Sequence, residues 1–280
     1  MSGDSARISG STRFIALIGH PVVQVKSPEP LNRWFDEHAA GAVILPMDVQ
    51  SDRVGAFLEA MRATENCIGV SVTMPHKQAA FALADEVSDR ARQVRAANIL
   101  RRTTDGRLVG DMVDGIGMMT ALEANGVSVV SRHVLVVGAG GAGTAIIHAA
   151  AEKGAAVITV IEADVARARE VVSGVSTRHP DIRVRTDLPA SDTVDIAINA
   201  SPAGMKPGDP HPFPLERLAG STIIADVVTR PALTPWLVAA REQGLKIQAG
   251  AEMTLAQLSI QLNFWGFPAE AVQFSKRDRA

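Results

Sequence analysis

The sequence predicts an α/β protein with two domains, the second of which contains a doubly wound parallel sheet. Short apolar segments rich in β-branched residues alternate with helix-like segments along the chain. One such segment, residues 134–137, leads directly into Gly138-Ala139-Gly140-Gly141-Ala142-Gly143 and a helix-like stretch, which is typical of a Rossmann-type domain. The 280 residues are sufficient for two hydrophobic cores.

The N-terminal elements predict an α/β domain without a phosphate-binding loop. Residues 1–13 are polar, lack the apolar core of a signal peptide and are interpreted as a disordered tail. The elements that follow are a strand at 14–18, a helix at 28–39, a strand at 42–46, a helix at 52–63, a strand at 69–74 and a helix at 75–84. Residues 97–102 and 108–110 are expected to form a hairpin around Asp105-Gly106.

Residues 115–250 are assigned to the dinucleotide-binding Rossmann domain. Its predicted strands are 134–137, 157–161, 195–199, 222–228 and 245–247, and its helices include 165–172 and 234–243, the second ending at Gly244. A final helix, 253–265, is expected to return to the first domain, so residues 14–114 and 251–280 form the substrate-binding and catalytic domain. We expect a cleft between the domains, with ligands at the carboxyl ends of the strands.

The glycine motif predicts a site for the pyrophosphate of a dinucleotide. Gly138 permits a tight turn, Gly140 lets phosphate approach the backbone, and Gly143 lets the helix pack on the strand. N–H groups at the helix start, at Gly141 and Ala142, attract the anion. The alternative is a plain connection between a strand and a helix.

Glu162, Ala163 and Asp164 indicate which dinucleotide binds. They follow the strand 157–161, about 20 residues after the motif, where a carboxylate accepts hydrogen bonds from the adenosine ribose. A carboxylate repels a 2′-phosphate, so the sequence favours NAD over NADP, although Arg167 lies one helical turn further on. In the alternative interpretation Glu162 and Asp164 only begin and cap the next helix.

Composition excludes several classes of function. A net charge of −2 and a pI near 6.4 give no electrostatic footprint for nucleic acid. Cys67 is the only cysteine, which excludes an internal disulfide and fits a reducing cytoplasm. No apolar stretch reaches the ~20 residues that span a bilayer, and no histidine–cysteine cluster has metal-ligand spacing. We therefore expect a cytoplasmic monomer or homodimer without a metal.

Several sequence blocks resemble, in the same order, those of the shikimate/quinate dehydrogenase family. They are Lys26-Ser27-Pro28, Val72-Thr73-Met74-Pro75-His76-Lys77, Ala96-Ala97-Asn98, Gly110-Asp111-Met112-Val113-Asp114-Gly115, Asn199-Ala200-Ser201-Pro202-Ala203-Gly204-Met205 and residues 250–257. The resemblance runs from residue 13 to residue 265. It implies reversible hydride transfer between nicotinamide and a ring hydroxyl of shikimate, quinate or a related cyclic hydroxy acid.

The resemblance implies that Lys77 and Asp114 are an acid–base pair. Alcohol oxidation needs a group that takes the hydroxyl proton while hydride leaves the same carbon. A helix start and burial both disfavour the ammonium form of Lys77, whereas a nearby Asp114 favours it, so the position of the proton stays open. The alternatives are a solvated lysine at a helix start and an aspartate in a turn or cap.

The resemblance also implies the remaining contacts. Ser27, Thr73, Asn98 and Gln257 match substrate positions, and Ser71 is expected to bind substrate at a position where the family usually has asparagine. Further cofactor contacts are expected at Ser201, Pro202, Met205, Val227, Gly250 and Met253. The segment 201–205 and Met253 are expected on the nicotinamide side; the alternative for 201–205 is a plain loop. Ser27 precedes Pro28 and is also a good helix N-cap.

The departures from the family concern the end of the substrate that carries its carboxylate. Val25 replaces a carboxylate-binding serine, Thr229 replaces a tyrosine, and Met112-Val113 replaces Asn-Thr before Asp114. A divergent paralogue with an altered carboxylate end therefore fits better than the biosynthetic enzyme. The alternative is a regulator that binds NAD and a metabolite without turnover, against which the retained Lys77 and Asp114 argue.

Overall fold

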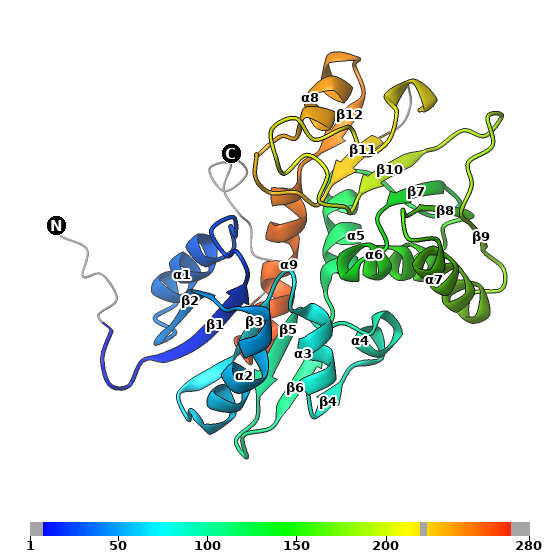
Figure 1. The fold of residues 1–280 in the computed structure, drawn as a ribbon. Helices are drawn as coiled ribbons and strands as arrows, with labels where there is room; N and C mark the ends of the chain where they lie inside the picture. Colours follow the sequence, from blue (N-terminus) through cyan, green and yellow to red (C-terminus); the bar gives the residue numbers. More distant parts are fainter. Residues whose placement is uncertain (1–7, 219–222, 270–280) are drawn as a thin grey trace. The chain divides into compact units, whose positions relative to one another are not determined.

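The computed structural model describes residues 8–218 and 223–269, and the chain divides into two compact units (Figure 1). Unit 1 contains the chain up to Val113 and again from Gln257, and unit 2 contains Asp114–Ala256. The chain passes from one unit to the other after Val113 and after Ala256, whereas the predicted domain boundaries were after residues 114 and 250. The helices α5 (Asp114–Ala124) and α9 (Gly250–Phe264) explain the difference, because α5 begins at Asp114 and α9 contributes residues to both units.

Unit 1 is built on a sheet of six strands, counted within the described residues, in the order β2-β1-β3-β5-β6-β4. The strands are β1 (Arg13–Gly19), β2 (Ala42–Asp48), β3 (Cys67–Val72), β4 (Glu86–Val87), β5 (Ile99–Arg102) and β6 (Leu108–Asp111). The strands β1, β2 and β3 run parallel, whereas β5 and β6 form the predicted antiparallel hairpin. Of the predicted tail, residues 1–7 lie outside the described residues.

The three helices predicted for unit 1 are present with shifted ends, and a fourth helix that was not predicted follows them. They are α1 (Pro28–Glu37), α2 (Val54–Ala63), α3 (Lys77–Leu83) and α4 (Asp89–Val94). The prediction that a helix begins at Pro75 is wrong, because α3 begins two residues later, at Lys77. The outer edge of β2 is covered by Asn32 of α1, whose Nδ2 donates to Ile44 O at 3.0 Å and whose Oδ1 accepts from Ile44 N at 2.8 Å.

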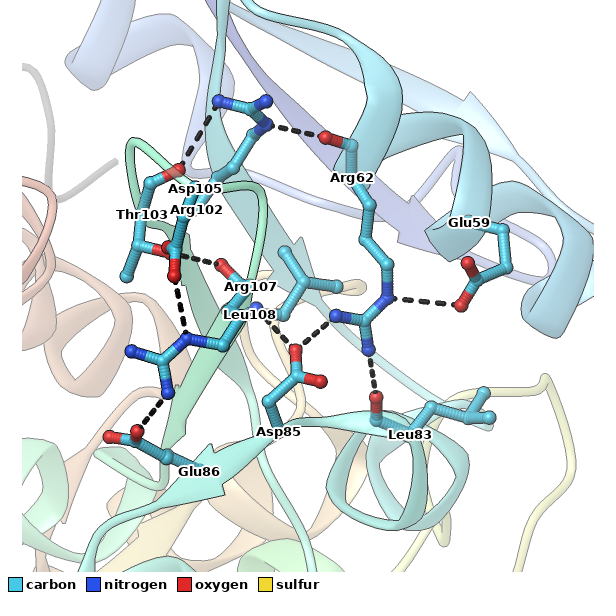
Figure 2. Close-up of polar contacts among 10 residues, drawn as sticks. All are labelled: Glu59, Arg62, Leu83, Asp85, Glu86, Arg102, Thr103, Asp105, Arg107 and Leu108. Carbon is cyan, nitrogen blue, oxygen red and sulfur yellow. Dashed lines mark hydrogen bonds and ion pairs between the residues drawn. The ribbon is translucent and has the colours of Figure 1, made fainter.

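A polar network joins α2, the end of α3 and the β5–β6 hairpin (Figure 2). The Asp85 carboxylate accepts the N–H of Leu108 at 2.7 Å and pairs with the Arg62 guanidinium, which also donates to Leu83 O at 2.6 Å and to Glu59 at 3.0 Å. The Leu108 N–H and the Arg62 side chain lower the pKa of Asp85. Asp85 therefore stabilises the fold when it is ionised.

We expect Asp85→Ala to lower the free energy of unfolding at pH 7 by about 1–2 kcal/mol, because a backbone N–H and a guanidinium lose their acceptor. The folded-state pKa is below the unfolded value, so this contribution is present above about pH 4 and lost as pH falls through the folded pKa. Urea unfolding at pH 7 and pH 3 measures both effects. Glu59→Ala removes an exposed partner of the same arginine and should cost about 0–0.5 kcal/mol. Equal losses for the two variants would contradict this.

Unit 2 contains an all-parallel sheet of six strands, again within the described residues, in the order β12-β11-β10-β7-β8-β9. The strands are β7 (His133–Val137), β8 (Val157–Ile161), β9 (Arg183–Arg185), β10 (Ile196–Asn199), β11 (Ile223–Asp226) and β12 (Lys246–Gln248). The chain extends outward from β7 in both directions, which confirms the doubly wound class and puts the topological switch between β7 and β10.

The helices of unit 2 are α5, α6 (Gly141–Glu152), α7 (Val165–Arg178) and α8 (Pro235–Glu242) (Figure 1). The helix predicted at 165–172 continues to Arg178, since Val171 and Val175 keep its apolar face in the core. Gly115 lets α5 approach α6 closely, because an added Cβ would lie 2.2 Å from Ala145 O. Gly244 follows α8 with φ +78°, the left-handed conformation expected of a glycine at a helix end.

Candidate functional site

The glycine loop has the backbone geometry that the sequence predicts. Gly138 has φ +97°, and an added Cβ would lie 2.9 Å from the Ala200 and Ser201 backbone. An added Cβ at Gly143 would lie 2.0 Å from Gly138 O, so α6 packs directly on the loop. At Gly140, just before α6, an added Cβ would meet nothing within 4 Å. These residues fit a bound pyrophosphate, since Gly140 leaves open space beside the N–H groups that begin α6.

Glu162 connects the end of β8 to this loop. Its Oε2 accepts the N–H of Ala139 at 2.7 Å and its Oε1 accepts the N–H of Asp164 at 3.1 Å. Asp164 caps α7 by accepting from Ala166 N and Arg167 N at 3.0 and 3.1 Å. The cap interpretation therefore holds for Asp164 but not for Glu162, whose carboxylate lies beside the glycine loop. Ala163 and Arg167 are exposed, and the Arg167 guanidinium lies 3.8 Å from Glu162.

The predicted nicotinamide-side residues follow β10 and β11. Ser201 and Met205 are half-buried and Pro202 is exposed, all in the loop after Asn199, and Val227 directly follows Asp226. Gly250 begins α9 where an added Cβ would lie 2.3 Å from Val228 O. Met253 is buried in the hydrophobic core of unit 2. Its contact with a nicotinamide ring stays a prediction.

The structure adds a buried carboxylate that the sequence did not single out, Asp226. The predicted strand 222–228 ran through this position, whereas β11 ends at Asp226. The side chain has no exposed surface, and burial raises its pKa to about 6. Its signal in the sequence is a carboxylate at the end of an apolar β-branched run, at the ligand-binding edge of a parallel sheet.

In unit 1 four predicted substrate residues, Ser71, Thr73, Asn98 and Gln257, lie at the carboxyl end of β3. Ser71 pairs in register with Ile99, and Val72 N donates to Asn98 O at 2.7 Å, so Asn98 lies beside the end of the strand that leads to Thr73. Asn98 Nδ2 donates to Gln257 Oε1 at 3.3 Å. The side chains of Ser71, Asn98 and Gln257 are all buried.

Lys77 and Asp114 occupy helix starts in different units. Lys77 is the first residue of α3, is half-buried, and its carbonyl accepts from Ala97 N at 2.9 Å, next to Asn98. Asp114 is the first residue of α5 and is 4% exposed. The Asn98 Oδ1 accepts from Val113 N at 2.9 Å and so fixes the residue just before Asp114. The pairing of Lys77 with Asp114 stays a prediction.

Ser27 does not act as the helix cap that its sequence context suggests. It is buried, has helical φ and ψ of −68° and −25°, and its side chain makes no capping hydrogen bond with α1. His76 is 2% exposed and its Nε2 lies 2.7 Å from Val49 O. Val25 and Thr229, where the sequence departs from the family pattern, are both half-buried.

Residues 8–218 and 223–269 contain neither a cluster suited to a metal ion nor a helix suited to span a membrane. No cluster of three or more histidine, cysteine, aspartate or glutamate side chains has the arrangement of a metal site. None of the helices in this part of the chain combines the length and apolar character needed to cross a bilayer.

Comparison with known proteins identifies the family. Residues 17–100 match the model of the shikimate dehydrogenase substrate binding domain. The chain is 35% identical over 258 residues to the shikimate dehydrogenase (NADP(+)) of Lysinibacillus sphaericus, covering 90% of this chain and 92% of that protein. A shikimate dehydrogenase solved in complex with NADP+ superposes with a TM-score of 0.86 at 26% identity, covering 95% and 93% of the two chains.

The shikimate 5-dehydrogenase of Listeria monocytogenes, solved in complex with shikimate and NAD, superposes with a TM-score of 0.81 at 30% identity. The match covers 92% of this chain and 93% of that one. Identity at this level over nearly the whole length, together with the two sheets described above, shows common descent of both units. The chain belongs to the shikimate dehydrogenase family.

Proposed function

We propose that the chain catalyses reversible hydride transfer between nicotinamide and a ring hydroxyl of shikimate, quinate or a related cyclic hydroxy acid. It is an oxidoreductase that acts on a CH–OH group, as its relatives are by name. The observation that carries the proposal is the gathering of Ser71, Asn98, Gln257 and the start of α3 at one end of the unit 1 sheet. Unit 1 is the proposed substrate domain and unit 2 the proposed dinucleotide domain.

The proposed roles of the site residues follow from the chemistry of their side chains. Lys77 and Asp114 exchange the hydroxyl proton of the substrate, and the dinucleotide, when bound, supplies or takes the hydride. Asn98 and Gln257 are polar, buried and joined to each other, so they present a preorganised pair of amides to ring hydroxyls. Because Ser27 is buried and does not cap α1, its hydroxyl is suited to an anionic substrate group.

An absorbance screen for reduced cofactor tests the function directly. The purified chain is incubated with NAD or NADP and with shikimate, quinate, amino-shikimates and related cyclic hydroxy acids. We expect turnover with at least one of them and weaker use of shikimate than in relatives, since Val25 and Thr229 remove polar groups from the carboxylate end. Cofactor binding without turnover on any of these substrates would contradict the proposal and favour the regulator.

We further propose that NAD binds more tightly than NADP, even though many curated relatives are named for NADP(+). Glu162 is supported for this role by its position beside the glycine loop, where its carboxylate would repel a 2′-phosphate. Calorimetric titration should give a Kd at least about 10-fold lower for NAD, equivalent to about 1.4 kcal/mol.

Glu162→Ser should reduce this ratio of dissociation constants, because the repulsion disappears. Glu170→Ser on the exposed surface of α7 is the matched control and should leave the ratio unchanged. Tighter binding of NADP by the parent chain would refute the preference.

A cytoplasmic location and a monomeric or homodimeric state complete the proposal. A single cysteine, Cys67, which is a free thiol and leaves the chain without an internal disulfide, supports the location.

A further inference from the structure

Asp226 is a fully buried carboxylate held by neutral donors. Its Oδ1 accepts from Asn199 Nδ2 at 3.0 Å and from Val228 N at 2.9 Å, and its Oδ2 accepts from Thr234 Oγ1 at 2.8 Å. The donors come from the end of β10, from the segment after β11 and from the residue that caps α8. A buried charge without a cation is costly, so this arrangement needs a reason beyond packing.

Asn199 transmits the position of Asp226 to the loop at residues 200–205. Its Oδ1 accepts from Ser201 N at 3.0 Å and from Ser201 Oγ at 2.7 Å, and its Nδ2 also donates to Ala203 O at 3.0 Å. Thr234 supports the same loop from the other side, because an added Cβ at Gly204 would lie 3.0 Å from it. The amide of Asn199 thus connects the loop to the buried carboxylate.

We propose that Asp226 is a positioning residue which, in its ionised form, fixes the loop at residues 200–205 for the nicotinamide through Asn199 and Thr234. The inference rests on the proposed function, since this loop carries the predicted contacts Ser201 and Met205. It assigns to the reaction a residue that need not touch substrate or cofactor.

The hydrogen-bond directions explain why the ionised form is required. The Asn199 Nδ2 group and the Val228 N–H can only donate, and the Thr234 hydroxyl accepts the N–H of Leu237 at 3.3 Å while it donates to Asp226. If the Asp226 carboxyl group were protonated, its O–H would be a further hydrogen-bond donor facing groups that already donate to it. The Thr234 hydroxyl must then reverse, or a bond to the loop or cap is lost.

The same surroundings determine the pH at which Asp226 becomes protonated. Burial raises the pKa of Asp226, and hydrogen bonds from the N–H groups of Val227 and Val228, from Asn199 and from Thr234 lower it. No charged side chain of β10, β12 or α8 is among these influences. Burial raises the pKa to about 6, so protonation occurs as pH falls below neutrality. The folded-state pKa lies above the unfolded value of 3.8, so ionisation lowers fold stability as pH rises through 6. Stability and loop order therefore change in opposite directions.

The test compares Asp226→Asn with the parent chain between pH 5 and pH 8. The amide mimics the protonated carboxyl group. At pH 7.5 we expect about 10-fold lower kcat with KM for the hydroxy acid changed less than about twofold. The fall in kcat near pH 6 in the parent should be absent from the variant, while fold stability at pH 7.5 is equal or higher.

Asp195→Asn is the matched control, because Asp195 lies at the opposite end of β10 and accepts from Arg132 and His133 N. It should keep the parent kcat and pH profile. If Asp226→Asn does not fold, Thr234→Val, which removes the hydroxyl donor, should reproduce the loss of kcat, and Thr234→Ser should restore it. Parent kcat and an unchanged pH profile in folded Asp226→Asn, or in Thr234→Val, would overturn the inference.

A binding measurement separates this inference from the proposed function. The affinity for NADH, measured by its fluorescence, should fall below pH 6 in the parent and be independent of pH over this range in Asp226→Asn. If the parent lacks turnover on every hydroxy acid, the proposed function fails and this titration alone decides the role of Asp226. Identical pH dependence in parent and variant would reject it.

Discussion

Lys77→Ala should lower kcat by about 10²–10⁴-fold, the range for loss of a positioned acid–base group. The affinity for NAD should stay within about twofold of the parent, because the predicted dinucleotide contacts lie in unit 2 and Lys77 lies in unit 1. Stopped-flow or steady-state kinetics give kcat, and calorimetry gives the dissociation constant. Loss of turnover with intact cofactor binding separates a role in proton transfer from a role in binding.

Lys153→Ala is the control for this experiment. Lys153 is also a lysine at a helix end, but it is paired on the surface with Glu123 and lies outside the proposed site. It should keep the parent kcat. A folded Lys77→Ala variant that turns over as fast as Lys153→Ala would remove Lys77 from the proposed chemistry.

The helices and strands that were predicted well are those whose own residues, or the residues next to them, mark where they begin and end. β8 was predicted at its observed ends because a β-branched run begins after Gly154-Ala155-Ala156 and ends before Glu162. The short elements β4, with its two residues, and α4, with its six, were missed since neither is long enough to display a periodicity. The structure shows that Ser88 caps α4 by accepting from Ala91 N, a contact that the sequence analysis did not identify.

In the candidate site, too, some features could be predicted from neighbouring residues and others depend on residues far apart in the chain. The turn at Gly138 and the close packing at Gly143 follow from a local motif, and the structure reproduces both. Asn98 and Gln257 lie far apart in the chain, so the family pattern indicates both as substrate residues, whereas the hydrogen bond between them is seen only in the structure. Asp226 follows an apolar run in the sequence, but its complete burial depends on the tertiary structure and cannot be predicted from that run alone.

Gly143→Ala should abolish dinucleotide binding and lower the free energy of unfolding by about 3 kcal/mol, the upper range for overpacking. The added Cβ would lie 2.0 Å from Gly138 O, a backbone atom, and neither residue can move easily, because Gly143 lies in α6 and Gly138 N donates to Ile161 O of the sheet. Urea unfolding and calorimetric titration with NAD measure the two effects. Gly174→Ala, at an open and exposed position inside α7, should instead be neutral or stabilising, by up to about 1 kcal/mol.

Gly140→Ala distinguishes a phosphate site from a merely structural glycine loop. An added Cβ at Gly140 meets nothing within 4 Å and its φ of −71° suits any residue, so the variant should fold with a stability within about 1 kcal/mol of the parent. If the pyrophosphate approaches the backbone here, the new methyl group lies in its path and the Kd for NAD should rise at least about 10-fold, or about 1.4 kcal/mol. Parent affinity in this folded variant would mean that the dinucleotide does not lie against Gly140, and the loop would then only connect β7 to α6.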